Sequence, residues 1–294
     1  VYDDGYLPAA GGGVDFRIGV SITTPSPVTT KAEVPGSSDE NAVSSFEVFV
    51  FERDAEGKLA AYGEKSGFSY SDRWLSLNTK AGDYRICVVA NFETIGTSVI
   101  RNYGDLCGLE LGDEYLPEAS DNDGGLTPQS PRVVMYGEEF VSLAPSDTPV
   151  QLTLGIDFVV SKLKVSLWNE LPPGESFVIK SVTLHDTRSG SMLAGQDVDS
   201  GAGINPPLAL YDDAAVMEPS VDDKFVSGVV YLFENRAGAV SSGGTDQKDK
   251  GAKALALVNY GKTPSYVLVS GVYTDPAGDR FNIEQRVDLG HDNH

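Results

Sequence analysis

The residues that decide the fold are 14–23, which read VDFRIGVSIT. Within them every second residue is apolar: Val14, Phe16, Ile18, Val20 and Ile22. Successive side chains of a β-strand point to opposite faces, so this alternation predicts a strand with one face in a core. The next apolar run, residues 46–51 (FEVFVF), is apolar on both faces and is typical of a central sandwich strand.

Short runs rich in Val, Ile, Phe, Tyr and Thr recur along the rest of the chain, separated by turn residues. They lie at residues 84–91, 133–135, 150–154, 158–168, 177–185, 226–233, 254–258 and 266–273. We expect 177–185 to pair with 158–168 across the turn at 171–174. Short helical turns are expected only within 98–111 and 208–217.

This order of elements predicts an all-β chain with two β-sandwich domains in tandem. The composition changes at residues 144–148 (APSDT), and we place the boundary near Gly155. The first sandwich then comprises residues 1–155 and includes the first strand, and the second comprises residues 156–294. The polar opening, residues 1–13, is typical of a tether behind a processed terminus.

The charge balance argues against nucleic acid as a partner. The chain carries 43 acidic and 22 basic side chains, a net charge of -21. Nucleic-acid binding needs the opposite balance, because phosphates are contacted by Lys and Arg. No apolar stretch of about 18 residues is present, so no membrane-spanning helix is expected.

The residues that catalysis requires are scarce. His185 is the only histidine outside the C-terminal tail, and it lies in an expected strand, beside Val182 and Leu184. The sequence has no G-x-S-x-G elbow, no phosphate-binding P-loop and no dinucleotide-binding glycine motif. We therefore predict no catalytic residues, no cofactor and no enzyme activity.

The sequence contains only weak indications of a metal site or of reactive cysteines. The start of a calcium loop at Asp121 fails because Arg132 stands at its twelfth position, where a bidentate glutamate is needed. Asp197 fails in the same way, with Leu208 at that position. Cys87 and Cys107 are favoured as buried free thiols over a disulfide, although their redox state stays open. No metal site is predicted.

Several segments, taken in order, resemble the fimbrillins of Bacteroidales, the subunits of their protease-assembled fimbriae. They are the strand at 14–23, the site TTKA at 29–32, the run 43–51 with its turn DAEGK at 54–58, AGDYRICVVAN at 81–91, VMYG at 134–137, VVSKLKV at 159–165 and VYLFEN at 230–235. Each motif is weak alone, and the order and spacing carry the resemblance.

The resemblance implies two transthyretin-like sandwich domains and export as a lipoprotein to the outer membrane, with the lipid on a cysteine upstream of Val1. It implies that a surface protease cuts between Lys31 and Ala32, where the family usually has Arg. The first strand, with Val14, Phe16, Ile18, Val20 and Ile22, would then leave, and a strand of another subunit would fill the groove. Family members usually continue past the segment 280–289 with further strands.

The expected function is thus that of a structural subunit of a surface fimbria that supports adhesion and whose partners are further copies, other subunits and the protease. A fimbrial anchor or a tip adhesin, which would contact a host protein or glycan through a loop such as 241–250, is the alternative within the family. A lipid-anchored carbohydrate-binding module is the alternative from another class, and it predicts exposed aromatic residues in a groove.

Overall fold

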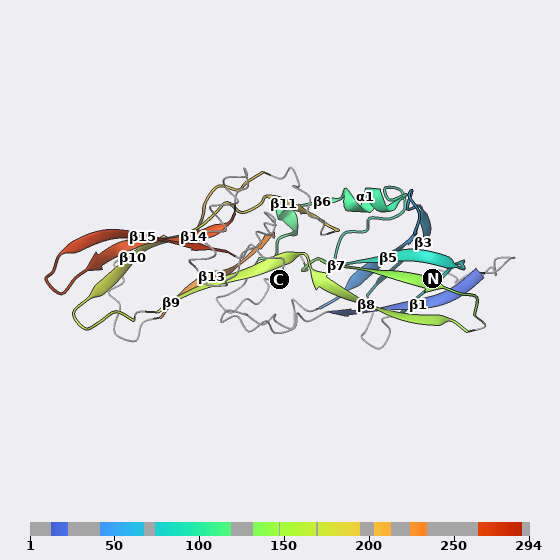
Figure 1. Cartoon of the computed structure of the whole chain (residues 1–294), viewed down its shortest axis with the longest axis horizontal. Coiled ribbons are helices and arrows are strands. Elements are labelled where there is room, and N and C mark those ends of the chain that lie inside the picture. Colours follow the sequence, from blue (N-terminus) through green and yellow to red (C-terminus); the bar gives the residue numbers. More distant parts are fainter. Residues whose placement is uncertain are drawn as a thin grey trace. The chain divides into compact units, whose positions relative to one another are not determined.

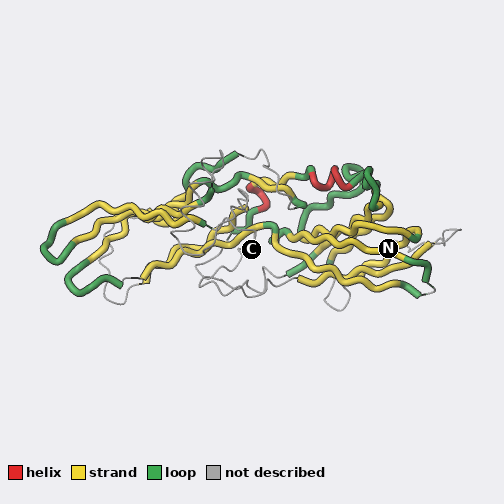
Figure 2. The backbone as a smooth tube through the Cα atoms, in the orientation of Figure 1, coloured by secondary structure: helices red, strands yellow, loops and turns green. Residues whose placement is uncertain are grey.

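The computed structural model describes residues 13–22, 42–67, 74–118, 132–146, 148–168, 170–194, 203–212, 224–233 and 264–289. Strands dominate these residues, and helix is confined to one short α-helix and one 3-10 turn (Figure 2). The predicted all-β class is therefore confirmed. No helix among the described residues is long and apolar enough to cross a membrane.

The chain forms two compact units. Unit 1 comprises Val1–Glu110, Arg132–Val159 and Met192–Gln196, and unit 2 comprises Leu111–Pro131, Val160–Ser191 and Asp197–His294. The short strands β6 (Glu110–Gly112) and β11 (Gly190–Met192) each contain a point at which the chain passes from one unit to the other, and η2 (Asp113–Tyr115) follows β6 in unit 2. The tandem boundary near Gly155 and the transthyretin-like type of the domains remain predictions.

Unit 1 is a two-layered β structure of seven strands (Figure 1). One layer has the order β3-β2-β5-β7 and the other β8-β1-β4, and β7 and β8 pair only at Met135–Phe158 and Tyr136–Asp157. Side chains of both layers meet in one core. The strands are β1 (Gly13–Ile22), β2 (Ser45–Glu52), β3 (Leu59–Ser66), β4 (Trp74–Lys80), β5 (Gly82–Ala90), β7 (Met135–Leu143) and β8 (Val150–Phe158).

Strand β2 is buried on both faces, as its sequence predicts. Phe46, Val48 and Val50 enter the core between the layers, and Phe49 and Phe51 are fully buried on the opposite face. On that face Phe51 meets Tyr103 edge-on, at 5.8 Å between ring centroids. Tyr103 opens α1 (Tyr103–Cys107), the short helix expected within 98–111, which a capping box begins at Asn102.

Unit 2 contains a four-stranded sheet, β12-β10-β14-β15, and a two-stranded sheet, β13-β9. Val182 and Leu184 of the first sheet share a core with Leu163 and Val165 of the second. The strands are β9 (Val160–Trp168), β10 (Ser176–His185), β12 (Leu208–Asp212), β13 (Lys224–Phe233), β14 (Tyr266–Thr274) and β15 (Arg280–Asp288).

One local prediction was wrong and another failed over the residues that the structure describes. β9 and β10 do not pair: β9 pairs with β13, and β10 pairs with β12 and β14, so the turn between β9 and β10 carries the chain from one sheet to the other. The helical turn expected within 208–217 is not formed by residues 208–212, which are strand β12 and pair with β10, and residues 213–217 lie outside the described residues. The predicted strand at 254–258 lies outside the described residues.

Candidate functional site: strand β1 and the slot that it fills

Strand β1 is an interior strand of its layer. It pairs antiparallel with β4, from Gly13–Lys80 to Gly19–Trp74, and parallel with β8, from Phe16–Val150 to Ile22–Ile156. Both backbone edges of β1 are therefore occupied over most of its length. Removing β1 would leave two unpaired strand edges facing each other across a slot one strand wide.

The apolar face of β1 is part of the core of unit 1. Val14, Phe16 and Ile18 are completely buried, and Val20 is 5% exposed. Burying side chains of this size contributes on the order of 1.5–3 kcal/mol each. Only the backbone of Ile22 is described, paired with Ile156. The alternation in the sequence thus identified Val14, Phe16, Ile18 and Val20 correctly as buried residues.

The walls of the slot come from the two neighbouring strands. Leu75 and Leu77 of β4 pair with Ile18 and Phe16, and they are half-buried against the core. On β8 the apolar residues occupy the even positions Val150, Leu152, Leu154 and Ile156. The sequence predicted a strand over residues 150–154 of this alternation but not that β8 lies beside β1. Parallel neighbours far apart in sequence leave no local signal.

The outer face of β1 is polar and partly covered. Asn78 Nδ2 donates a hydrogen bond to Asp15 Oδ1 at 2.7 Å, and Arg17 is exposed. Gly19 lies under the indole of Trp74. The slot therefore has an apolar floor in the core and an outer side on which Trp74 restricts the size of one residue.

The expected processing site, Lys31 and Ala32, lies outside the described residues. In the sequence Lys31 follows the end of β1 at Ile22 and precedes β2, which begins at Ser45. A cut there would separate β1 from the rest of unit 1 in the covalent chain. The processing role of Lys31 and Ala32 and the release of β1 remain predictions.

His185 does not belong to a catalytic arrangement. Its ring stacks on Tyr266 at 4.8 Å between centroids, and its Nε2 lies 2.7 Å from Thr183 Oγ1. Among the described residues no three His, Cys, Asp or Glu side chains gather in a way that could hold a metal ion. The acidic loops that begin at Asp121 and Asp197 lie outside that part of the chain.

Both cysteines are free. Cys87 is fully buried beneath the segment that carries α1, and burial raises the pKa of its thiol to about 12. Tyr136 Oη lies 3.4 Å from Cys87 Sγ and 2.6 Å from Glu138 Oε2. A thiol that stays protonated in this setting is a poor nucleophile, so Cys87 packs the outer face of β5.

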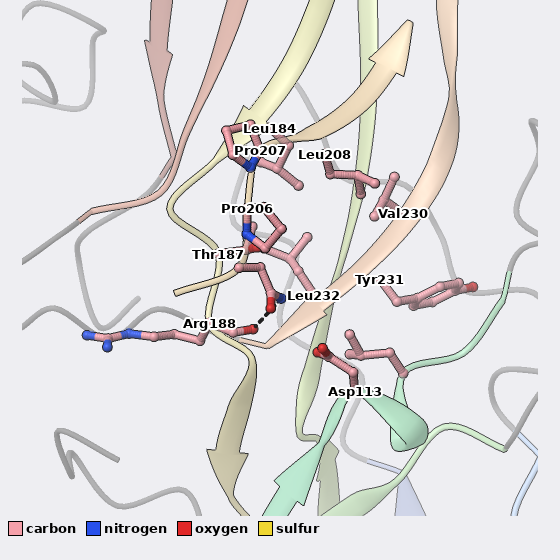
Figure 3. A pocket seen from close by; sticks show the side chains of 12 residues that line it. Asp113, Leu184, Thr187, Arg188, Pro206, Pro207, Leu208, Val230, Tyr231 and Leu232 are labelled. Atoms are coloured by element: carbon pink, nitrogen blue, oxygen red, sulfur yellow. Dashed lines mark hydrogen bonds between the residues drawn. The ribbon is translucent and has the colours of Figure 1, made fainter. Parts of the chain in front are cut away.

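Unit 2 contains a hollow of about 320 Å³ between the sheet edges β12 and β13 (Figure 3). Leu184 and Val230, both part of the core cluster of unit 2, line it together with Pro206 and Pro207. Arg188 directs its side chain away from the hollow, and its carbonyl oxygen accepts a hydrogen bond from Asn205 Nδ2 at 3.2 Å. The lining suits an apolar group and assembles no catalytic residues.

A second feature that the sequence analysis missed is a stack of cations and aromatic rings on unit 1. Phe140 is 47% exposed and has the guanidinium carbons of Arg53 and Arg85 each 4.6 Å from its ring centroid. Arg85 also lies 3.7 Å from the ring centroid of Tyr103. Such contacts contribute about 0.5–1 kcal/mol each at exposed sites, so this stack fastens α1 to β5 and β7.

Comparison with known proteins agrees with this architecture. Residues 17–153, from within β1 to within β8, match the profile of a family described as major fimbrial subunit protein (FimA). No curated protein sequence matches. Among solved structures, a proposed cell adhesion protein from Parabacteroides distasonis has a TM-score of 0.53 at 14% identity, over 94% of this chain and 80% of that chain.

Two further structures are similar over comparable lengths. The C-terminally truncated tip fimbrial protein Mfa3 of Porphyromonas gingivalis has a TM-score of 0.49 at 14% identity, over 92% of this chain and 81% of that chain. The fimbrial anchor protein Mfa2 of the same species has a TM-score of 0.46 at 14% identity, over 94% and 82%.

The strand architecture and the FimA match define a class: a bacterial surface protein with a fimbrial structural or adhesion role, and not an enzyme. More particularly, the matched segment, residues 17–153, is similar to the fimbrillins of the Bacteroidales. This similarity supports a place in a cell-surface fimbria and interaction with other fimbrial subunits.

Proposed function

We propose that this chain polymerises by strand exchange: a surface protease cuts at Lys31–Ala32, β1 leaves, and a strand of another subunit takes its place. The observation that carries the proposal is that β1 is paired on both edges and has its apolar face in the core. A vacated slot would expose the edges of β4 and β8 together with apolar core surface, and an incoming strand satisfies both by β-augmentation.

The residues that line the slot determine which side chains the incoming strand must have. It needs apolar side chains at alternate positions to replace Val14, Phe16, Ile18 and Val20. It needs a small residue at the place of Gly19, where Trp74 lies close. Loss of β1 without a replacement would expose several buried side chains at once, so the emptied subunit would be unstable and prone to capture a strand.

The test is limited proteolysis of the chain with a Lys-specific and, separately, an Arg-specific protease, followed by size-exclusion chromatography and mass spectrometry. We expect one cut after Lys31 and then oligomers whose subunits lack the residues before Ala32. Lys31→Gln is the matched control, because it removes the cleavage site and leaves every residue of β1 in place. A cleaved chain that stays a monomer would contradict strand exchange.

Retention of β1 would favour the alternatives within the family. An anchor or a tip subunit would keep its first strand and end the polymer, and export as a lipid-anchored precursor fits either role. In the same experiment an anchor or a tip resists the cut at Lys31 while stalk subunits are processed, so the two outcomes are distinguishable. Protein or glycan ligands on the host would then be sought with the uncut chain.

A further inference from the structure

Strand β15 is the end strand of the four-stranded sheet of unit 2 (Figure 1). It pairs with β14 along its whole length, from Tyr266–Asp288 to Thr274–Arg280. Within the described part of the chain no strand pairs with its other edge. That edge presents a row of backbone N–H and C=O groups, which is a template for another strand.

The side chains of β15 continue an apolar face beyond the core. Ile283 and Val287 pair with Gly271 and Val267 and lie on the same face as those residues, and Val267 is buried in the core of unit 2. Farther along the same face Phe281 is 48% exposed and Ile283 is 39% exposed. The strand therefore combines an open edge with apolar side chains that its own unit leaves in contact with solvent.

Two of the usual protections of an edge strand are missing from β15, namely proline and a bulge. Its charged side chains, Arg280, Glu284, Arg286 and Asp288, are of both signs and can therefore pair with those of a second strand. The sequence RFNIEQRVD contains no proline, lysine or glycine, and its register with β14 runs without a shift. By contrast, the β10–β14 and β9–β13 pairs each contain a register shift. The edge is thus regular over nine residues.

The sequence of β15 is complementary to itself when two copies run antiparallel with Gln285 opposite Gln285. This register places Ile283 opposite Val287 and Glu284 opposite Arg286, and each pair occurs twice because the arrangement is two-fold symmetric. At its ends it places Phe281 opposite Leu289 and Asn282 opposite Asp288. Apolar and opposite-charge cross-strand pairs of this kind stabilise antiparallel strands.

Neighbouring registers that keep both apolar faces on one side are less favourable. Centring the pair on Glu284 places two carboxylates directly opposite each other, and centring it on Ile283 places Arg280 opposite Arg286. Like charges in directly opposed positions destabilise a strand pair. A shift by one residue would turn the apolar face of one copy to the other side. Of the registers centred on Ile283, Glu284 and Gln285, only the one centred on Gln285 opposes no like charges.

The two charged side chains that this register pairs, Glu284 and Arg286, can each form an ion pair with a second copy. Glu284 is exposed and has no ion-pair partner among the described residues. Arg286 is held in place, with its Nε 2.7 Å from Asp288 Oδ1 and its guanidinium carbon 3.7 Å from the ring centroid of Tyr266. Its terminal N–H groups remain for a second carboxylate, because a guanidinium has five donors.

We propose that β15 is a self-association edge through which a second copy of this chain binds, antiparallel and centred on Gln285. The contact joins the two four-stranded sheets into one continuous sheet. It is distinct from the slot of β1 and does not rest on strand exchange. A contact made by one strand pair is smaller than a standard interface, so the association is weak and reversible.

Disulfide trapping tests this register directly. In the proposed pair the two copies of residue 285 face each other, so Gln285→Cys should form a cross-linked dimer under mild oxidation, seen by non-reducing electrophoresis. Asn282→Cys is the matched control, because two copies of residue 282 would lie about 20 Å apart, six residues along the strand. The unmodified chain, with its free Cys87 and Cys107, controls for native thiols. Equal trapping of both variants, or none, would overturn the proposal.

Charge exchange gives a second, independent test by sedimentation velocity over a concentration series. Glu284→Arg should weaken the dimer about tenfold, because it places like charges opposite each other at two positions. Arg286→Glu should do the same. The variant with both exchanges should have a dimer dissociation constant within about threefold of that of the unmodified chain. Failure of the double variant to restore the dimer would overturn the Glu284–Arg286 pairing, and a monomeric unmodified chain would overturn self-association.

Discussion

Gly19 of β1 lies directly beneath the indole ring of Trp74 on β4: a Cβ atom on Gly19 would stand 3.0 Å from Trp74 Cζ3. The two residues are register partners in the antiparallel pair. The absence of a side chain at position 19 therefore lets Trp74 lie flat over the strand. This relationship makes position 19 a size restriction for whichever strand occupies the slot.

Substituting Gly19 tests that restriction. Gly19→Ala should lower the free energy of unfolding by about 1–3 kcal/mol, because the methyl group must displace the indole. Chemical denaturation followed by Trp fluorescence gives the measurement. Gly13→Ala is the matched control at the start of the same strand, where the added methyl group would meet only the flexible side chain of Asn78. Equal effects at both positions would contradict the restriction.

The buried side chains of β1 should contribute most of the free energy that holds β1 in unit 1. Phe16→Ala should cost about 3–5 kcal/mol of unfolding free energy, since it empties a fully buried site. Arg17→Ala, on the exposed side of the same strand, should change stability by no more than about 0.5 kcal/mol. After cleavage behind β1, Phe16→Ala should also speed assembly, because the fragment leaves more easily. Slower assembly of this variant would argue against release of β1.

The burial of the Cys87 thiol predicts that the stability of the fold depends on pH. In the unfolded chain a thiol titrates near pH 8.5, whereas burial keeps the folded Cys87 protonated up to its pKa of about 12. Its stabilising effect is complete below about pH 8.5 and is lost as pH rises from there toward 12. Cys87→Ala should make the decline in unfolding free energy over this range shallower, by up to about 1.4 kcal/mol per pH unit. Identical slopes would contradict burial of the thiol.

The Glu47 carboxylate should fasten a loop to the outer face of unit 1. Glu47 is 6% exposed and accepts hydrogen bonds from Tyr62 Oη and from the backbone N–H groups of Ile95 and Gly96, the latter two at 2.9 and 3.0 Å. Glu47→Gln should cost about 1.5–3 kcal/mol, the range for hydrogen bonds to a charged group. Glu64→Gln, an exposed carboxylate that also accepts from Tyr62, should cost far less.

A double-mutant cycle between Glu47→Gln and Tyr62→Phe gives the control. The unfolding free energy lost by the double variant should be smaller than the sum of the losses of the two single variants, because the two side chains share one hydrogen bond. Hydrogen exchange at the Ile95 and Gly96 amides should accelerate in Glu47→Gln. Unchanged protection of these amides would show that the carboxylate does not hold the loop.

Local patterns predicted the strands well and their partners poorly. The alternation at Val14–Val20 and the two-sided run at Phe46–Phe51 each identified the correct buried residues, because burial follows directly from side-chain period. Pairing of β1 with β8 escaped prediction, since nothing local distinguishes one apolar alternation from another as a neighbour. The β9–β10 pairing was wrong for the same reason: a short turn favours a hairpin, but it also permits a change of sheet.

The candidate site was predictable in its apolar residues and not in its walls. The five alternating residues of β1 stand out in the sequence, whereas the closeness of Gly19 to Trp74 depends on a register that only the structure provides. The exposed edge of β15 was likewise invisible, because its sequence resembles that of any half-buried strand. Its significance follows from the missing neighbour and from the unburied Phe281 and Ile283.

The most direct test of strand exchange is a disulfide that locks β1 in its slot. Arg17 and Ser76 are exposed register partners on β1 and β4, so Arg17→Cys with Ser76→Cys should form a bond across the strand pair. The account predicts that this variant, cut after Lys31, stays monomeric while oxidised and forms oligomers once a reductant is added. Oligomers formed equally well by the oxidised, locked protein would contradict the account.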